Sequence, residues 1–131
     1  MPAPTPETSP FSYLVLQVVP NAERGERINV GVVLFCRQRD FLGARVGLHH
    51  ARLAALDPEL PMLELADHLD AVVRVLDASP GAGPVSRLPA SERFGWVAAP
   101  SSTIVQPSEV HTGLCREPAV TLDALYERLV R

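Results

Sequence analysis

Residues able to hold an anion gather in the loop that precedes the second apolar segment of the chain. Arg24 and Arg27 stand three positions apart with Glu26 between them, and Asn29 and Gly31 follow directly. A guanidinium can grip a phosphate or carboxylate through two parallel hydrogen bonds. A glycine inside a strand admits a close approach by a ligand or by another backbone. These five residues form the first candidate ligand-binding set.

The same loop has a second interpretation that needs no ligand. Alternating charges are common on exposed turns, where Glu23 and Arg27 could simply pair with each other. Gly31 would then mark a bulge or a tightly packed position of the strand. The residues alone leave both interpretations open.

A second group lies in the hydroxyl-rich segment 101–113, SSTIVQPSEVHTG. His111, near serine and glutamate, is a candidate general acid–base, although no nucleophile-elbow sequence surrounds any of these serines. Serine and threonine beside short strands also commonly bond local backbone groups. The candidate ligand-binding residues of this segment are Ser102, Thr103, Gln106, His111 and Thr112.

Composition narrows the chemistry further. All twelve basic residues are arginine, which excludes a Schiff-base lysine and a P-loop lysine. A formal charge of -3 with scattered arginines argues against a nucleic-acid surface. No CxxC, HxxxH or HxH spacing occurs, so we expect no metal and no cofactor. The longest apolar run, 32–36, is too short to cross a membrane. Cys36 and Cys115 are read as reduced thiols of a cytoplasmic protein.

The elements that must position these residues begin with three strands. Segments 11–19 and 28–36 are rich in β-branched and aromatic residues, and in 41–48 the apolar residues Leu42, Ala44, Val46 and Leu48 share one face. Short polar connections between these three segments predict an antiparallel meander. Regular alternation in the second strand would place Asn29 and Gly31 together on one face.

Helical periodicity follows the meander. A short helix is predicted over 49–56, Asp57–Pro58 resembles a helix start, and apolar positions from Met62 to Leu76 predict a long amphipathic helix. Its outer side offers an Asp70–Arg74 ion pair. The later elements are a flexible loop over 79–92, short strands over 94–98 (with Trp96 in the core) and 103–106, and a final helix capped by Thr121.

The length of 131 residues suits a single domain. Residues 1–10 carry four prolines and are expected to be a disordered leader, so that the domain spans 11–131. The predicted fold class is α+β, an antiparallel sheet of four to five strands. Two or three helices, including the long helix and the C-terminal helix, are expected to pack on one face of this sheet.

Two strings of this sequence resemble a bacterial family of small proteins catalogued as a domain of unknown function, DUF3037. They are FSYLVLQVVPNAERGERINVGVVLF near the start and STIVQPSEVHTGLC near the end. The resemblance extends over 11–131. Genes of this family often stand beside a kinase that resembles the persistence toxin HipA, so the resemblance implies such a kinase as a protein partner. It also suggests that the two strings meet on one sheet face and form a polar pocket.

Two functions follow from these observations. The favoured one is a non-catalytic binding or accessory module that uses the surface of Arg24, Asn29 and His111. The alternative is a small enzyme acting on an anionic or phosphorylated substrate, with His111 as acid–base and Arg24 or Arg27 as anion clamp. A homo-oligomer is compatible with either function.

Overall fold

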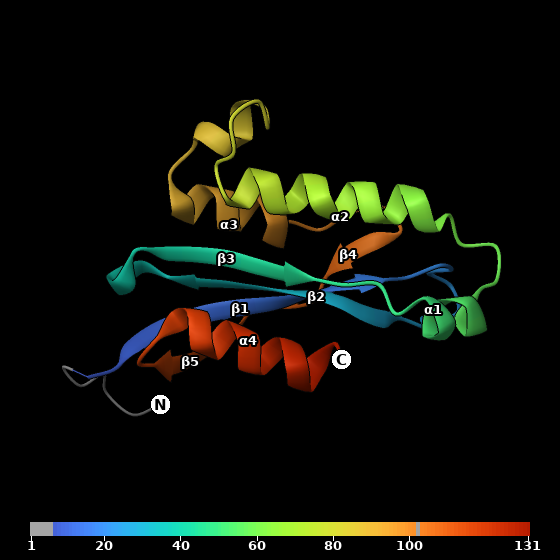
Figure 1. The fold of residues 1–131 in the computed structure, drawn as a ribbon, viewed down its shortest axis with the longest axis horizontal. Helices are drawn as coiled ribbons and strands as arrows, with labels where there is room; N and C mark the ends of the chain where they lie inside the picture. The colour runs from blue at the N-terminus through green and yellow to red at the C-terminus, as the bar shows by residue number, and fades with distance from the viewer. Residues whose placement is uncertain (1–6, 102) are drawn as a thin grey trace.

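The sheet has its longest strand in the middle. In the computed structural model, which describes residues 7–101 and 103–131, β1 (Ser9–Val18) pairs antiparallel with β2 (Ile28–Cys36), and β2 pairs with β3 (Phe41–Val46). The other edge of β1 pairs with β4 (Val105–Pro107) and, further along, with β5 (His111–Cys115) (Figure 1). The predicted meander is therefore confirmed.

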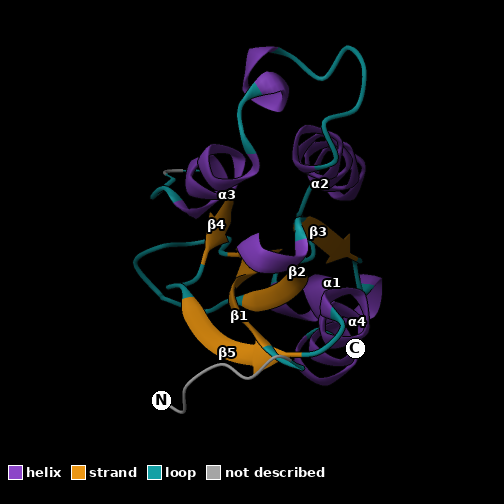
Figure 2. Cartoon of the chain, turned by 90° about the vertical axis from the view of Figure 1, so that its left-hand side faces the viewer, coloured by secondary structure: helices purple, strands orange, loops and turns teal. Residues whose placement is uncertain are grey.

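Helices cover both faces of this sheet. On the first face, α2 (Met62–Leu76) and α3 (Ala90–Ala98) pack over apolar side chains of β1 and β2, such as Leu14 and Val33. On the second face, α4 (Pro118–Leu129) packs against the opposite side of β2. The short α1 (His50–Leu56) lies at one end of the sheet (Figures 1 and 2). No helix of the described residues is long and apolar enough to span a bilayer.

The α+β fold class is confirmed, but α4 does not lie beside α2 as we expected. Strand β2 is apolar on both sides, and Val32, Leu34 and Cys36 would face water if both helices shared the first face. Covering these three side chains with Leu122 and Leu125 of α4 removes that apolar surface from water.

A β-bulge breaks the alternation that we expected along β2. Leu16 of β1 pairs with Gly31, whereas the next residue, Gln17, pairs with Asn29, so that Val30 is the extra residue. An extra residue shifts the side-chain alternation by one position. Asn29 therefore lies on the second face and Gly31 on the first. The prediction that they share a face was wrong.

The segment 94–98, predicted as a strand, belongs to helix α3. Pro89 precedes the helix, and Phe94 and Val97, three positions apart, are its buried residues. This spacing places Trp96 on the flank of the helix, where 42% of its surface is exposed, so it is not a core residue. Within 79–92, a 3-10 helix spans Pro84–Arg87 and α3 begins at Ala90.

Several boundaries also differ from the sequence predictions. Helix α2 begins at Met62 rather than after Asp57, whose carboxylate instead accepts a bond from Glu59 N–H in a turn. Helix α4 begins at Pro118 rather than at Thr121. Strand β1 includes Ser9 and Pro10, which were assigned to the leader, and residues 1–6 lie outside the described residues. Strand β5 was not predicted, because HTGLC shows no clear alternation of polar and apolar residues.

Candidate functional site

The two sequence segments that carry the candidate residues do meet on the second face of the sheet. Gln17, in the central strand, is level with Asn29 on one side and with Gln106 on the other. These three side chains form a polar row across three strands. The tertiary structure thus brings one residue of the first set and one of the second within two strand spacings of each other.

The amides of this row are already bonded within the protein. Gln17 Nε2 donates to Asn29 Oδ1 at 3.0 Å, and Asn29 Nδ2 donates to the backbone oxygen of Leu129 at 2.9 Å. Arg27 donates to Gln17 Oε1 at 3.3 Å, and Gln106 Nε2 donates to the Thr103 carbonyl at 3.1 Å. Leu129 is the last residue of α4, where carbonyls lack a partner within the helix. We conclude that the row fastens the end of α4 to the sheet.

Replacing Asn29 with alanine should therefore weaken the fold. The change removes the donor to Leu129 and leaves Gln17 without its acceptor, so we expect a loss of about 1–2 kcal/mol in the free energy of unfolding. Urea denaturation of the two proteins measures this loss. Gln106→Ala is the matched control, because its amide bonds only to the local Thr103 carbonyl, and it should cost less. Equal stability of Asn29→Ala and the unmodified protein would contradict a structural role for Asn29.

His111 is not part of the polar row. It is level with Tyr13, four residues along β1 from Gln17, which corresponds to about 13 Å. Its imidazole lies against the Tyr13 ring with the ring centroids 5.2 Å apart, and the histidine is exposed. Thr112 is also exposed and belongs to the opposite face of β5 by strand alternation. Ser102 lies outside the described residues.

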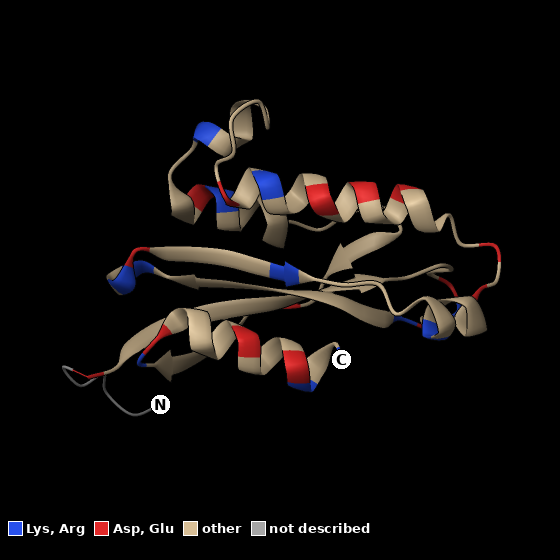
Figure 3. Cartoon of the chain, in the orientation of Figure 1, with Lys and Arg blue, Asp and Glu red and all other residues tan. Residues whose placement is uncertain are grey.

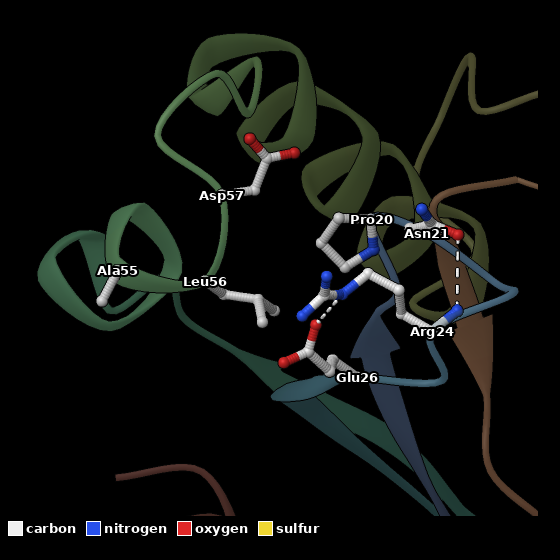
Figure 4. A pocket seen from close by; sticks show the side chains of 7 residues that line it. All are labelled: Pro20, Asn21, Arg24, Glu26, Ala55, Leu56 and Asp57. Carbon is white, nitrogen blue, oxygen red and sulfur yellow. Dashed lines mark hydrogen bonds and ion pairs between the residues drawn. The ribbon is translucent and has the colours of Figure 1, made fainter.

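Arg24 and Glu26 line a hollow of about 410 Å³ at the end of the sheet, together with Asn21, Leu56 and Asp57 (Figure 4). Arg24 Nε bonds to Glu26 Oε1 at 2.5 Å, and this hydrogen bond, more than the accompanying charge attraction, raises the pKa of Arg24. The Glu23–Arg27 pair considered for this loop is thus replaced by Arg24–Glu26.

This hollow is not an arginine clamp for an anion. Two carboxylates, Glu26 and Asp57, line it with one guanidinium, which Glu26 already neutralises. Arg27 lies elsewhere, donating to Gly25 O and to Gln17. The structure therefore does not bring Arg24 and Arg27 together around one ligand position.

Gly31 is a packing position. A Cβ atom on this residue would lie 2.9 Å from a methyl group of Val46 and 3.1 Å from the backbone oxygen of Arg45. Both residues belong to the neighbouring strand β3. Gly31 is thus a tightly packed position of the strand, which is the second of the two interpretations that the sequence left open.

An apolar groove lies between α2, α3 and β4, beside the second segment. We call it the Trp96 groove. Its first part, about 280 Å³, is lined by Trp96, Val72, Val97 and Pro107, with the polar side chains of His68 and Thr103. A second hollow of about 190 Å³ shares His68, Thr103 and Val105 with the first and extends to Glu64.

Sequence reasoning identified Thr103 but missed Trp96 and His68 as partners of the same site. The available signal was the helical spacing of Phe94 and Val97, which leaves Trp96 at the helix flank. The prediction of a strand over 94–98 placed Trp96 in the core and gave no reason to expect an exposed side chain there.

The two cysteines offer no reactive nucleophile. Both are buried free thiols. Burial raises the pKa of Cys115 to about 11, and the neighbouring Cys36 adds to the rise. A thiol with such a pKa is almost entirely protonated at neutral pH, and the thiolate is the nucleophilic form. Among the described residues no group of three or more His, Cys, Asp or Glu side chains could hold a metal ion.

These features describe a small α+β domain with helices on both faces of its sheet and an apolar groove open to solvent. The chain belongs to the family described as Protein of unknown function (DUF3037), whose model matches residues 13–130. This match confirms the resemblance carried by the two strings. No curated protein and no solved structure matches the chain.

Proposed function

We propose that this protein is a non-catalytic binding module whose Trp96 groove takes an extended apolar segment of a protein partner that carries a basic residue. The observation that carries the proposal is the exposure of Trp96. Trp96 is 42% exposed, while Val72 and Val97 beside it are buried. Tryptophan is strongly enriched among the residues that dominate binding energy, because it buries a large rigid surface and keeps one hydrogen-bond donor.

The chemistry of the groove favours an extended segment with some polar groups. Trp96 and Pro107 provide apolar walls, and His68 supplies a hydrogen-bonding side chain between the two hollows, whereas the Thr103 hydroxyl already donates to the Val105 carbonyl at 2.8 Å. Such a combination holds the side chains of a peptide by burial and its backbone by hydrogen bonds.

The charge around the groove favours a basic residue in the partner. Glu64 lines the second hollow, and Asp67 lies one helical turn further along α2. Figure 3 shows acidic positions, in red, along α2. Among the described side chains neither carboxylate is within ion-pair distance of an arginine, unlike Asp70, which pairs with Arg74 at 3.7 Å. An arginine or lysine in the partner would find an acidic surface at this end of the groove.

The alternative enzyme finds less support. It requires His111 and Arg24 or Arg27 around one substrate, but His111 lies on β5 beside Tyr13, whereas both arginines lie in the loop beyond the end of β1. Proton transfer and anion binding need those groups within hydrogen-bond reach of one molecule. A binding role does not depend on that arrangement.

The family resemblance suggests which partner to examine. A cytoplasmic bacterial kinase resembling HipA is the candidate, and the occupant of the groove would then be a segment of that kinase. A purified kinase of this type should be retained by the immobilised protein and lost on Trp96→Ala. If Trp96→Ala retained the kinase as well as the unmodified protein does, the kinase would bind a surface other than the groove.

Peptide selection tests the groove itself. From a phage-displayed library of random dodecapeptides, we expect clones that combine apolar residues with arginine or lysine. Trp96 is the only tryptophan, so binding of a selected synthetic peptide should shift its fluorescence to shorter wavelength. Trp96→Ala should weaken peptide affinity, measured by titration calorimetry, by about tenfold or more, and Glu64→Gln by a few fold.

The matched control is Val120→Ala, an equally simple truncation of an exposed apolar residue on α4, on the far side of the sheet. It should leave peptide affinity unchanged. Peptides that bind Trp96→Ala as well as the unmodified protein, or a selection that yields none, would refute the proposed groove function.

A further inference from the structure

In the part of the chain that the structure describes, strand β5 forms an open edge of the sheet. Among the described residues it pairs only with β1. Figure 2 shows β5 at the margin of the sheet, on the opposite side from α4. An open edge presents backbone N–H and C=O groups that another strand can use.

The hydrogen bonds of β1 show which groups of β5 are free. Ser108 N donates to Val15 O at 2.7 Å and Val19 N donates to Ile104 O at 2.8 Å, so the odd-numbered residues of β1 direct their backbone groups towards β4 and β5. Antiparallel pairs alternate between bonded and non-bonded.

The register between β1 and β5 then shows which residues of β5 bond to β1. Tyr13 is level with His111, Phe11 with Gly113 and Ser9 with Cys115. These three β5 residues therefore bond to β1. It follows that Thr112 and Leu114 direct their N–H and C=O groups outward, away from the sheet.

Within its five residues, this edge lacks the charges and proline that usually prevent pairing, although Glu109 and Arg116 flank it. The five residues of β5, HTGLC, include no arginine, no acidic residue and no proline. Strand β3, at the other edge, contains Arg45 and directly follows a turn with Arg37 and Arg39. Charged side chains and proline are the common means by which proteins protect a sheet edge.

We propose that β5 pairs antiparallel with β5 of a second copy of this chain, about a two-fold axis through Gly113. In this register Thr112 of one copy faces Leu114 of the other, and both residues have outward backbone groups. The two pairs exchange about four hydrogen bonds. All five residues of each strand overlap, and the pairing joins two sheets into one.

Gly113 suits the centre of such an interface. On the axis it would form a non-bonded pair with its own copy, the type of pair in which the two strands approach most closely. Its missing side chain leaves room on the second face, where the Phe11 ring already lies against it, since a Cβ on Gly113 would be 2.8 Å from that ring. Within the five paired residues of β5, no carboxylate or guanidinium of one copy faces one of the other.

Sedimentation analysis tests this interface and does not depend on the groove function. We expect the full chain to dimerise with a dissociation constant in the micromolar range, because the interface is small. Leu114→Pro removes an outward N–H without touching the bonds to β1, and should reduce dimerisation at least tenfold. Thr112→Lys should act similarly by placing a charge at the edge. Val120→Lys, on α4, should dimerise normally.

Hydrogen exchange supplies a second readout. The amides of Thr112 and Leu114 should become protected as protein concentration rises, whereas those of His111 and Gly113 should be protected at all concentrations. Circular dichroism checks that the variants remain folded. A monomer at several hundred micromolar, or a dimer that Leu114→Pro and Thr112→Lys both leave intact, would overturn the proposal.

Discussion

Truncation of Leu14 to alanine is expected to be the most damaging single change, costing about 2–5 kcal/mol in the free energy of unfolding. Leu14 lies in the central strand and is 0% exposed. It belongs to the cluster that joins the sheet to Leu69 of α2 and Phe94 of α3. The loss combines the lost burial of the leucine with the cavity that its removal leaves behind.

Leu63→Ala is the matched control for this prediction. The same substitution is made on α2, but Leu63 is 84% exposed, so the change should stay within about 0.5 kcal/mol. Urea titrations followed by circular dichroism give both values. Comparable losses for the two variants would mean that the first-face core is not centred on Leu14.

Gly31→Ala should be the second most damaging change, with an expected loss of about 1–3 kcal/mol. The new methyl group would approach the Arg45 backbone oxygen to 3.1 Å and the Val46 side chain to 2.9 Å. The Val46 methyl can move, but the oxygen belongs to a strand that is bonded to β2. Relief therefore requires the β2–β3 pair itself to shift.

Gly95→Ala is a control in which the same substitution should raise the free energy of unfolding instead of lowering it. Gly95 lies within α3, and a Cβ there would meet no atom within 4 Å. Alanine is the better helix former, so this variant should gain about 0.5–1 kcal/mol of stability. If Gly31→Ala instead had the same melting temperature as the unmodified protein, close packing of Gly31 against β3 would be refuted. Gly31 would then again be a candidate for close approach by a ligand.

The contrast between the two candidate surfaces bears on function. The polar residues of the two family strings attract attention because they are chemically versatile, yet Asn29, Gln17 and Arg27 bond mainly to one another and to the end of α4. Trp96 carries less obvious chemistry but keeps an exposed aromatic surface. We therefore place the binding site in the groove, because Trp96 is free to contact a partner whereas these polar side chains are already bonded within the protein.

Much of the fold could be read from the chain. Apolar and β-branched runs identified the first three strands, and the spacing of Leu65, Leu69, Val72 and Leu76 identified α2. These signals are local, because a strand or helix that buries one side must repeat its apolar residues with its own period. The third strand and the short α1 follow the same logic.

The elements that were misread depend on distant contacts. Segment 94–98 is short and apolar, so either a strand or a helix fits it, and α3 is selected by packing of Phe94 and Val97 against the sheet. Strand β5 gains its backbone bonds from Ser9, Phe11 and Tyr13, about a hundred residues earlier in the chain. No local pattern in HTGLC records that partner.

By itself the sequence determined the family, the α+β class, the meander and the absence of any lysine-based chemistry. Tertiary structure alone decided the placement of α4 on the second face, the bulge at Val30 that separates Asn29 from Gly31, and the solvent exposure of Trp96. The physical reason is the range of the interactions involved. Periodicity follows from the geometry of each element, whereas a site depends on which groups remain unbonded after distant strands and helices have paired.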